Sequence, residues 1–161
     1  MENLFDVIKC QELYVSGANK IDDSGSLIDV TESVRAMTEG PSQFSIAIAG
    51  STTNAITITI TCQDVDGNTL TGVRNLEFLV SDDSTGAGLA STLAPDSITA
   101  STGEVLTALT ANLHLMIQTA ASGIAVLKLT DAAQGAGFVA VTKPLTGALT
   151  VGEIVTGDYT D

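Results

Sequence analysis

Three oxygen-bearing side chains stand at alternate positions in the stretch Asp64-Val65-Asp66-Gly67-Asn68, the spacing with which a calcium-binding loop begins. A helix-flanked calcium loop closes with a bidentate Glu at its twelfth position, which counted from Asp64 is Asn75. No helical pattern flanks the stretch. A hairpin turn is therefore the favoured interpretation, and a weak calcium site is the alternative.

The other residues that could do acid–base or thiol chemistry stand apart from one another. His114 lies between two leucines in a strand-like run, and no nucleophile or acid can be placed beside it from the sequence, so we expect a satisfied or exposed side chain. Cys10 and Cys62 are 52 positions apart without a CxxC spacing, which predicts reduced thiols rather than a metal site. The sequence thus predicts no catalytic residue, no metal ligand and no cofactor.

Two further patterns are interpreted as loops. The pairs Asp22-Asp23 and Asp82-Asp83 lie among turn-forming residues, where solvated charge explains them better than general acid catalysis. The run Thr85-Gly86-Ala87-Gly88 lacks the Gly-Lys-Ser/Thr ending of a phosphate-binding loop, and no helix follows it. An enzyme is therefore the least favoured class of function.

The elements that must position these residues are strands. From Phe44 to Ile48 and from Ile56 to Thr61, larger apolar residues alternate with Ser, Ala or Thr. Further strand-like runs, separated by Gly, Asp, Asn and Ser, cover residues 76–81, 104–109, 113–119, 124–130, 138–142 and 149–155. Seven or eight short strands without a long helix predict an all-β sandwich or barrel. Residues 82–96 are too polar and glycine-rich for a core strand, and predict a surface excursion that crosses between sheets.

Charge limits the partners that this chain can have. The 161 residues include 19 acidic and 6 basic ones, a formal charge of −13. We expect no direct contact with nucleic acid, because phosphate neutralisation needs clustered Lys and Arg. The acidity is explained by repulsion between neighbouring copies, and attraction to a basic partner is the alternative. No apolar run spans a membrane and Glu2 and Asp6 interrupt any signal peptide, so we expect no membrane partner and synthesis in a cytoplasm.

Residues 1–42 differ from the rest of the chain. They hold three of the six basic residues, and they predict only a short strand at residues 13–15 and one or two helical turns over residues 29–37, which cannot stand alone. We therefore predict an attachment segment over residues 1–42 and a sandwich over residues 43–161. The partner-binding residues expected in the segment are Phe5, Ile8 and Tyr14. Alternatively, the segment forms the first strands of the same core.

Two stretches combine a strand, a turn and a second strand. The first covers residues 56–80 and turns at Asp64–Asn68, and the second covers residues 119–141, with a glycine turn at Gly123 before its first strand and a turn at Asp131 after it. Together they resemble bacterial and phage immunoglobulin-like domains, over about residues 55–142. The sequence departs from that pattern at residues 82–117, which are longer than the usual connection. The resemblance implies an all-β, immunoglobulin-like β-sandwich.

The same resemblance implies a function. It points to a non-enzymatic virion protein of a tailed bacteriophage, a capsid decoration or cement protein present in many copies. Its N-terminal segment would bind the major capsid protein or another virion protein, while the sandwich faces outward. The alternative is a collar, tail or fibre component, or a surface adhesin module, that binds a glycan or host molecule.

Overall fold

The computed structural model describes residues 19–21, 27–29, 41, 43–142 and 149–159. The chain divides into two units, residues 1–40 and residues 41–161. In the first unit, β1 (Asn19–Ile21) and β2 (Leu27–Asp29) pair antiparallel. The sequence does not predict this pair, because three-residue strands are too short to show alternation. Phe5, Ile8, Tyr14 and Cys10 lie outside the described residues, as do the strand at residues 13–15 and most of the helical turns, and these stay predictions.

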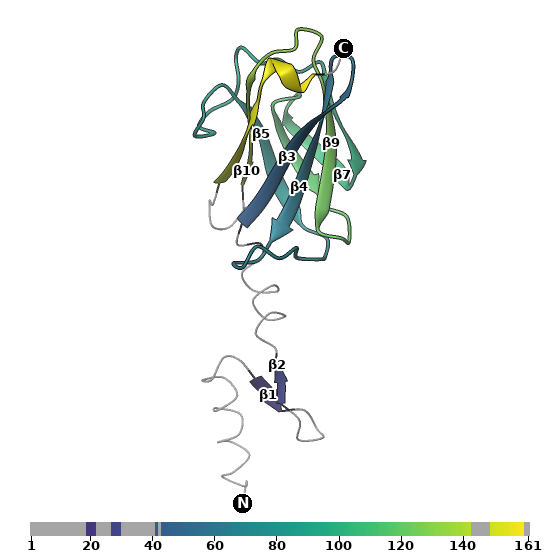
Figure 1. Ribbon diagram of the computed structural model, residues 1–161, viewed down its shortest axis with the longest axis vertical. Coiled ribbons are helices and arrows are strands. Elements are labelled where there is room, and N and C mark those ends of the chain that lie inside the picture. The colour runs from purple at the N-terminus through teal and green to yellow at the C-terminus, as the bar shows by residue number, and fades with distance from the viewer. Residues whose placement is uncertain (1–18, 22–26, 30–40, 42, 143–148, 160–161) are drawn as a thin grey trace, which may run out of the picture. The chain divides into compact units, whose positions relative to one another are not determined.

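The described strands of the second unit form two antiparallel sheets packed face to face (Figure 1). In the four-stranded sheet the order is β3 (Gln43–Thr52), β4 (Ala55–Gln63), β9 (Ile124–Thr130) and β6 (Ser97–Thr102). In the five-stranded sheet the order is β11 (Leu149–Ile154), β10 (Gly137–Thr142), β5 (Asn75–Ser81), β8 (His114–Gln118) and β7 (Glu104–Thr110). A short 3-10 helix, η1 (Thr156–Asp158), follows β11. The predicted all-β sandwich is confirmed.

The spatial order of the strands is immunoglobulin-like. The two sheets correspond to strands A-B-E-D and G-F-C-C′-C″ of a variable-type sandwich. The connectivity differs in two ways: β6, in the position of strand D, precedes β7 and β8 in the chain, and β7, in the position of C″, precedes β8, in the position of C′. Both changes concern residues 82–117, the segment where the sequence departs from the family pattern.

The core shows why these residues form strands. In β4 the three isoleucines are fully buried, while Thr57, Thr59 and Thr61 between them are half-buried on the outer face. Alternate side chains of a strand point to opposite faces, so one face of β4 packs against the other sheet. The core between the sheets contains Phe44, Ile56, Ile58, Ile60, Cys62, Leu76, Phe78, Val80, Leu93, Leu115, Ile117, Leu127, Leu129, Val139, Val141 and Ile154.

Strand β6 is missing from the sequence-based prediction. It lies at the edge of its sheet and pairs only with β9, with a bulge between Ala100 and Thr102. Its one large apolar residue is Ile98, which is buried, and the other residues are Ser, Thr and Ala. A single inward apolar residue gives no period-two signal, so the pattern cannot reveal this strand.

The hairpin turn at Asp64–Asn68 is confirmed, because Gln63 and Thr69 on its two sides form an antiparallel bridge. Gly67 N–H donates to the Asp64 carbonyl at 3.2 Å. However, β4 and β5 belong to different sheets, so residues 64–74 form an arch between the sheets. Within the arch, Leu70 N–H donates to the Cys62 carbonyl at 2.9 Å, which folds the turn back on the end of β4.

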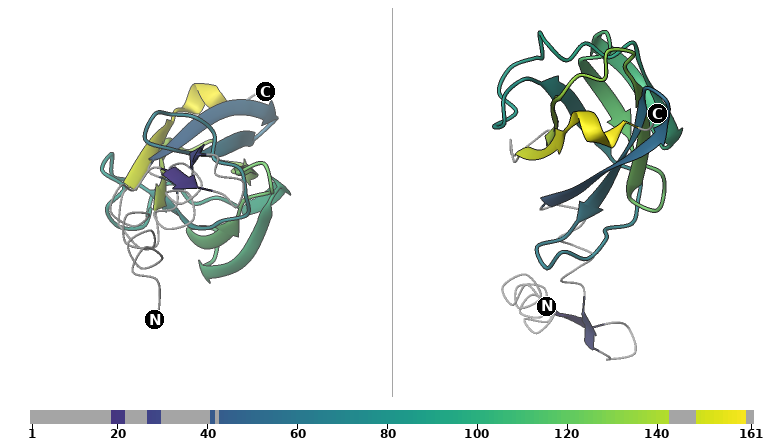
Figure 2. Two further views of the ribbon diagram at one scale, coloured as in Figure 1. Left: turned by 90° about the horizontal axis from the view of Figure 1, so that it is seen from below. Right: turned by 45° about the horizontal axis from the view of Figure 1, so that its top comes forward.

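Strand directions give the sandwich two different ends (Figures 1 and 2). The proximal end carries Pro41, the start of β3, the arch at residues 64–74 and the turn at residues 119–123. The distal end carries residues 82–96, 111–113, 131–136 and η1. Residues 82–96 join the five-stranded to the four-stranded sheet, which confirms the predicted crossing between sheets.

At the proximal end, two connections pack so closely that one position requires glycine. Gly123 has φ +76°, and an added Cβ would clash with the carbonyl oxygen of Leu70 in the arch. Gly72 N–H in the same arch donates to the Ala121 carbonyl at 2.7 Å. The backbones of the arch and the 119–123 turn are therefore in direct contact.

We predict that Gly123→Ala destabilises the protein more than Gly88→Ala does. Both glycines have left-handed backbones, with φ +76° and +79°, where a Cβ costs about 1–2 kcal/mol. Space around Gly88 is open, whereas alanine at position 123 must also displace the Leu70 carbonyl. Urea unfolding should therefore show a clearly larger loss of unfolding free energy for Gly123→Ala. Equal losses would contradict the close packing of the two connections.

Candidate functional site

Acidic residues concentrate at the distal end of the sandwich. Among the described residues there, no Lys or Arg accompanies them. The carboxylates are those of Asp82, Asp83, Asp96, Asp131, Glu153 and Asp158. Carboxylates at such an end could hold a cation, catalyse acid–base chemistry or accept hydrogen bonds from the loop backbone. Their hydrogen bonds distinguish these roles.

The Asp82 carboxylate holds the long distal loop. Its Oδ2 accepts hydrogen bonds from the N–H groups of Ser91 at 2.7 Å and Thr92 at 2.9 Å, and from both hydroxyls. Its Oδ1 accepts the N–H of Leu93 at 3.2 Å, and the Leu93 side chain is fully buried in the core. The N–H of Ser91, together with those of Leu93 and Thr92, holds the pKa of Asp82 well below its usual range. This one side chain therefore fixes the crossing between the sheets.

Four more aspartates at this end accept backbone N–H groups. The hydrogen bonds measure 2.7–3.0 Å. Asp83 accepts from Thr85, Asp96 from Ala132, Asp131 from both Ala133 and Gly135, and Asp158 from Val155. Asp131 is buried, whereas Asp82 and Asp83 are exposed. Of the six carboxylates, only Glu153 accepts no hydrogen bond from the residues that the structure describes. These acids serve loop structure, which agrees with the interpretation of Asp82-Asp83 as turn residues.

An open hollow of about 270 Å³ lies beside the Asp82 loop. Its lining residues are Asp82, Thr92, Ala136, Gly137, Phe138, Glu153 and Ile154. The oxygens of Asp82 already accept loop hydrogen bonds, so Glu153 supplies the free carboxylate. Within the described ranges, no three side chains of His, Cys, Asp or Glu are grouped to hold a metal ion.

In the turn that is the alternative calcium site, both carboxylate oxygens of Asp64 accept hydrogen bonds from the turn itself. Oδ1 of Asp64 accepts the N–H groups of Asp66 at 2.9 Å and Asn68 at 2.8 Å. Its Oδ2 accepts the Asn68 side-chain amide at 3.1 Å. A cation would have to replace these hydrogen bonds, which favours the turn over the calcium site.

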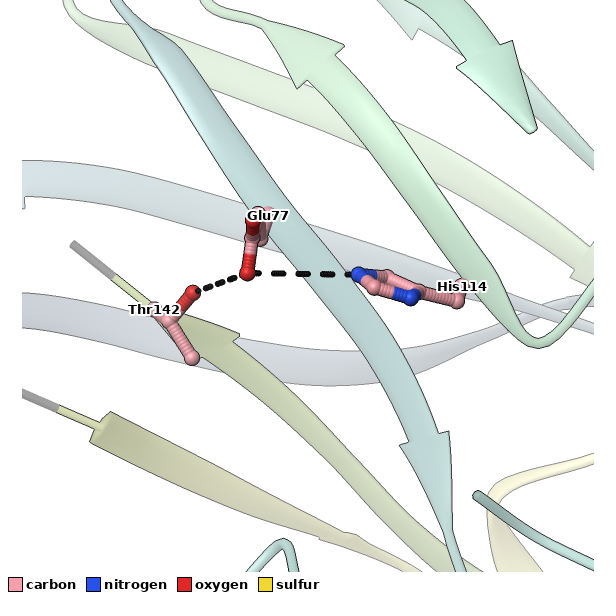
Figure 3. Close-up of polar contacts among 3 residues, drawn as sticks. All are labelled: Glu77, His114 and Thr142. Atoms are coloured by element: carbon pink, nitrogen blue, oxygen red, sulfur yellow. Dashed lines mark hydrogen bonds and ion pairs between the residues drawn. The ribbon is translucent and has the colours of Figure 1, made fainter. Parts of the chain in front are cut away.

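His114 belongs to a polar cluster on the outer face of the five-stranded sheet (Figure 3). The Thr142 hydroxyl donates to Oε2 of Glu77 at 3.1 Å, and Nε2 of His114 lies 3.9 Å from the same oxygen. Because Glu77 lies between the hydroxyl and the imidazole, the three do not form a nucleophile, base and acid in sequence. Nε2 is buried without a hydrogen-bond partner among the described residues, so the expectation of a satisfied or exposed histidine is wrong for this atom.

Two large apolar side chains are exposed on the edge strand next to β8. The edge strand β7 has two bulges, and Leu106 and Leu109 are their extra residues. These leucines are 42% and 55% exposed. In the neighbouring strands, Met116 pairs with Thr107 and Leu79 pairs with His114.

Cys62 lies in the core as a free thiol. Burial raises its pKa to about 11, only partly offset by the charge of Arg74. The thiolate, which is the nucleophilic form, is therefore scarce at neutral pH.

The amino-acid sequence does not reveal most of the aspartates that accept loop hydrogen bonds, nor the bulged leucines. An Asp followed two positions later by a residue whose N–H it accepts is a usable signal for a loop, as at Asp83 and Asp131. The long-range tie from Asp82 to residues 91–93 has no such local signal. The bulges of β7 have none either, because a bulge is a property of the pairing.

No family model, curated protein or solved structure matches this chain. In the part of the chain that the structure describes, no helix has the length and apolar character needed to cross a membrane. The fold and the geometry above are therefore the basis for functional inference.

We predict that Asp82 makes stability depend on pH. Its folded-state pKa lies below the ordinary 3.8, so its contribution is complete above pH 3.8 and is lost as the pH falls toward the folded-state value. Urea unfolding between neutral pH and about pH 3 should therefore show a larger loss for the wild type than for Asp82→Asn. The control is Asp66→Asn, which leaves the Asp82 loop intact and should follow the wild type. If Asp82→Asn also followed the wild type, the stabilising role of the hydrogen bonds between Asp82 and residues 91–93 would be refuted.

We also predict that calcium does not stabilise the protein. Replacing millimolar calcium by chelator should change the melting temperature by less than about 5 °C, a shift of roughly 1 kcal/mol at this size. Asp64→Ala should lower the melting temperature equally in both conditions, since it removes the turn hydrogen bonds. A loss seen only in calcium would show that Asp64 binds the ion.

Proposed function

We propose that this chain is a non-enzymatic structural protein of a tailed-phage virion, of the capsid decoration or cement type. It is made in the host cytoplasm and resides on the virion in many copies. Its N-terminal segment binds the major capsid protein or another virion protein, and its immunoglobulin-like sandwich faces outward.

The observation that carries this proposal is that the chain enters the sandwich at one end and the acidic loops lie at the other. Pro41 and the start of β3 lie at the proximal end, while the acidic loops lie at the opposite end. A sandwich held through the residues that precede Pro41 would therefore present its acidic distal end away from the attachment point. Like charges at that end would keep neighbouring copies apart and soluble.

The state of the polar side chains supports a non-enzymatic role. Five of the six distal carboxylates accept loop hydrogen bonds, and Cys62 is a buried thiol of raised pKa. Glu77 separates the hydroxyl of Thr142 from the imidazole of His114. These groups are engaged in structure and leave no activated nucleophile among the described residues.

The alternative function is binding of a glycan or host molecule by a collar, tail, fibre or adhesin module. The hollow at the distal end favours it, because Phe138 offers an aromatic surface and Glu153 a free carboxylate. Few convergent polar groups on an apolar wall are typical of small-molecule sites.

Attachment is tested in the full chain with the triple variant Phe5→Ala, Ile8→Ala and Tyr14→Ala. Burying a side chain of this size contributes about 1.5–3 kcal/mol, so each loss should weaken binding roughly tenfold or more. We expect the triple variant to fail to bind virions that lack the protein, while the sandwich unfolds at the wild-type temperature.

The matched control is Val65→Ala with Val73→Ala, since both valines are 57% exposed on the proximal arch. This control should bind as the wild type does. Wild-type binding by the triple variant would refute attachment through these residues. Loss of the cooperative unfolding transition would instead support the alternative that the segment belongs to the sandwich core.

A further inference from the structure

The hollow at the distal end lies where the ends of three strands meet. Phe138, at the start of β10, pairs in register with Ser81 at the end of β5 and with Glu153 near the end of β11. Asp82 follows Ser81, and its hydrogen bonds to residues 91–93 hold the long loop at the hollow. Strand pairing and these hydrogen bonds therefore fix the walls of the hollow before any ligand arrives.

An aromatic ring and a carboxylate stand side by side in this hollow. Val139 and Ile154, the residues that follow Phe138 and Glu153 in the chain, are fully buried in the core. Alternate side chains of a strand point to opposite faces, so Phe138 and Glu153 both point to the outer face of the sheet. Directly opposite residues of antiparallel strands hold their Cβ atoms about 4.5–5.5 Å apart. One ligand group can therefore contact both side chains.

The charge of the hollow is not balanced by its lining. Asp82 and Glu153 are the two charged residues of the lining, and both are acidic. Glu153 accepts no hydrogen bond from the residues that the structure describes, and Oδ1 of Asp82 accepts only the N–H of Leu93, at 3.2 Å. An anion would be repelled here, and a neutral ligand would leave both charges without a partner. A cationic group is the ligand that complements the hollow.

The lining favours an organic cation over a metal ion. Within the described ranges, no three side chains of His, Cys, Asp or Glu are grouped to hold a metal, whereas calcium takes six to eight oxygen ligands. The face of an aromatic ring attracts an ammonium or guanidinium group within about 6 Å of its centre. A guanidinium also binds a carboxylate through two parallel hydrogen bonds and stacks on aromatic faces. The pair of Phe138 and Glu153 thus matches a guanidinium group.

The size of the hollow limits the ligand further. Its volume of about 270 Å³ lies below the roughly 300–1,000 Å³ of pockets that enclose drug-sized ligands. An open hollow of this size admits one side chain and leaves the backbone of a partner outside. The apolar stem of an arginine would lie along the apolar part of the wall, at Ala136 and Phe138.

We propose that the distal hollow binds an arginine side chain of a partner protein. The guanidinium stacks on the ring of Phe138 and pairs with the carboxylate of Glu153. Asp82, which its loop hydrogen bonds hold in place, adds negative charge without having to move. This inference goes beyond the proposed function, in which the distal end faces away from the virion, and it requires only the folded sandwich.

The test is an amide-resolved NMR titration of the full chain with Nα-acetylarginine methylamide, in about 0.15 M salt. We expect chemical-shift changes at residues 136–138 and 153–154, with a Kd near 1 mM, because one exposed ion pair and one ring contact bind weakly. The matching citrulline amide replaces the guanidinium by a neutral urea group of the same shape, and it should cause no change there. The lysine amide should bind severalfold more weakly, because an ammonium cannot stack on the ring or form the two parallel hydrogen bonds.

Two variants test the two contacts separately. Glu153→Gln keeps the shape of the side chain and removes its charge, and Phe138→Leu removes the ring. Each should weaken binding of the arginine amide severalfold. The control is Glu104→Gln, which makes the same change in net charge at the start of β7, where Glu104 pairs with Gln118 beside the proximal turn. It should bind as the wild type does.

Absence of these shifts at about 10 mM arginine amide, tenfold above the expected Kd, would overturn the proposal. Equal binding of the citrulline amide, or unchanged binding by Glu153→Gln, would do the same. Equal binding of the lysine amide would overturn the choice of arginine, and the same shifts with calcium chloride would assign the hollow to a metal ion. Glu153→Gln alters an exposed side chain, so it keeps the test decisive if Phe138→Leu fails to fold. No virion is present, so the outcome is independent of the attachment function.

Discussion

The structure depends on burying one face of each sheet against the other. Ile56, Ile58 and Ile60 of β4 are fully buried, and Phe78 lies in the same core from the facing sheet. Because only 4% of the residues are aromatic, the core is filled mainly by aliphatic side chains. The alternating isoleucines of β4 supply such side chains on the face that is buried. Consecutive strands such as β4 and β5, or β5 and β6, then belong to different sheets, so their connections must cross the open ends of the sandwich.

Those crossings explain where the polar residues are used. A connection over the end of a sandwich leaves backbone N–H groups without strand partners, and each needs an acceptor. Asp82 accepts those of residues 91–93, while Asp64 and Asp131 do the same for shorter turns. Acidity at the ends is thus partly a structural requirement.

The sequence predicted what depends on local alternation. The strands around β4 and β9 were found because each places a continuous apolar row in the core. Strand β6 was not found, since an edge strand with one buried isoleucine carries no alternation. The hairpin turn at Asp64–Asn68 was predicted correctly, but periodicity identifies a strand and not the sheet that it joins, so the crossing from β4 to β5 could not be predicted. The surroundings of the His114 Nε2 depend on Glu77 of β5, and the bulged leucines depend on the register of β7 with β8, so no local pattern could show them.

The central claim is that the chain attaches through its N-terminal segment and leaves its distal end free. Amide hydrogen exchange of the full chain, free and bound to virions, tests it most directly, because exchange reports the protection of each segment separately. The account predicts that protection gained on binding falls within residues 1–40, while residues 82–96 and 131–136 exchange as in the free chain. Protection gained in those distal loops, with residues 1–40 unchanged, would contradict it.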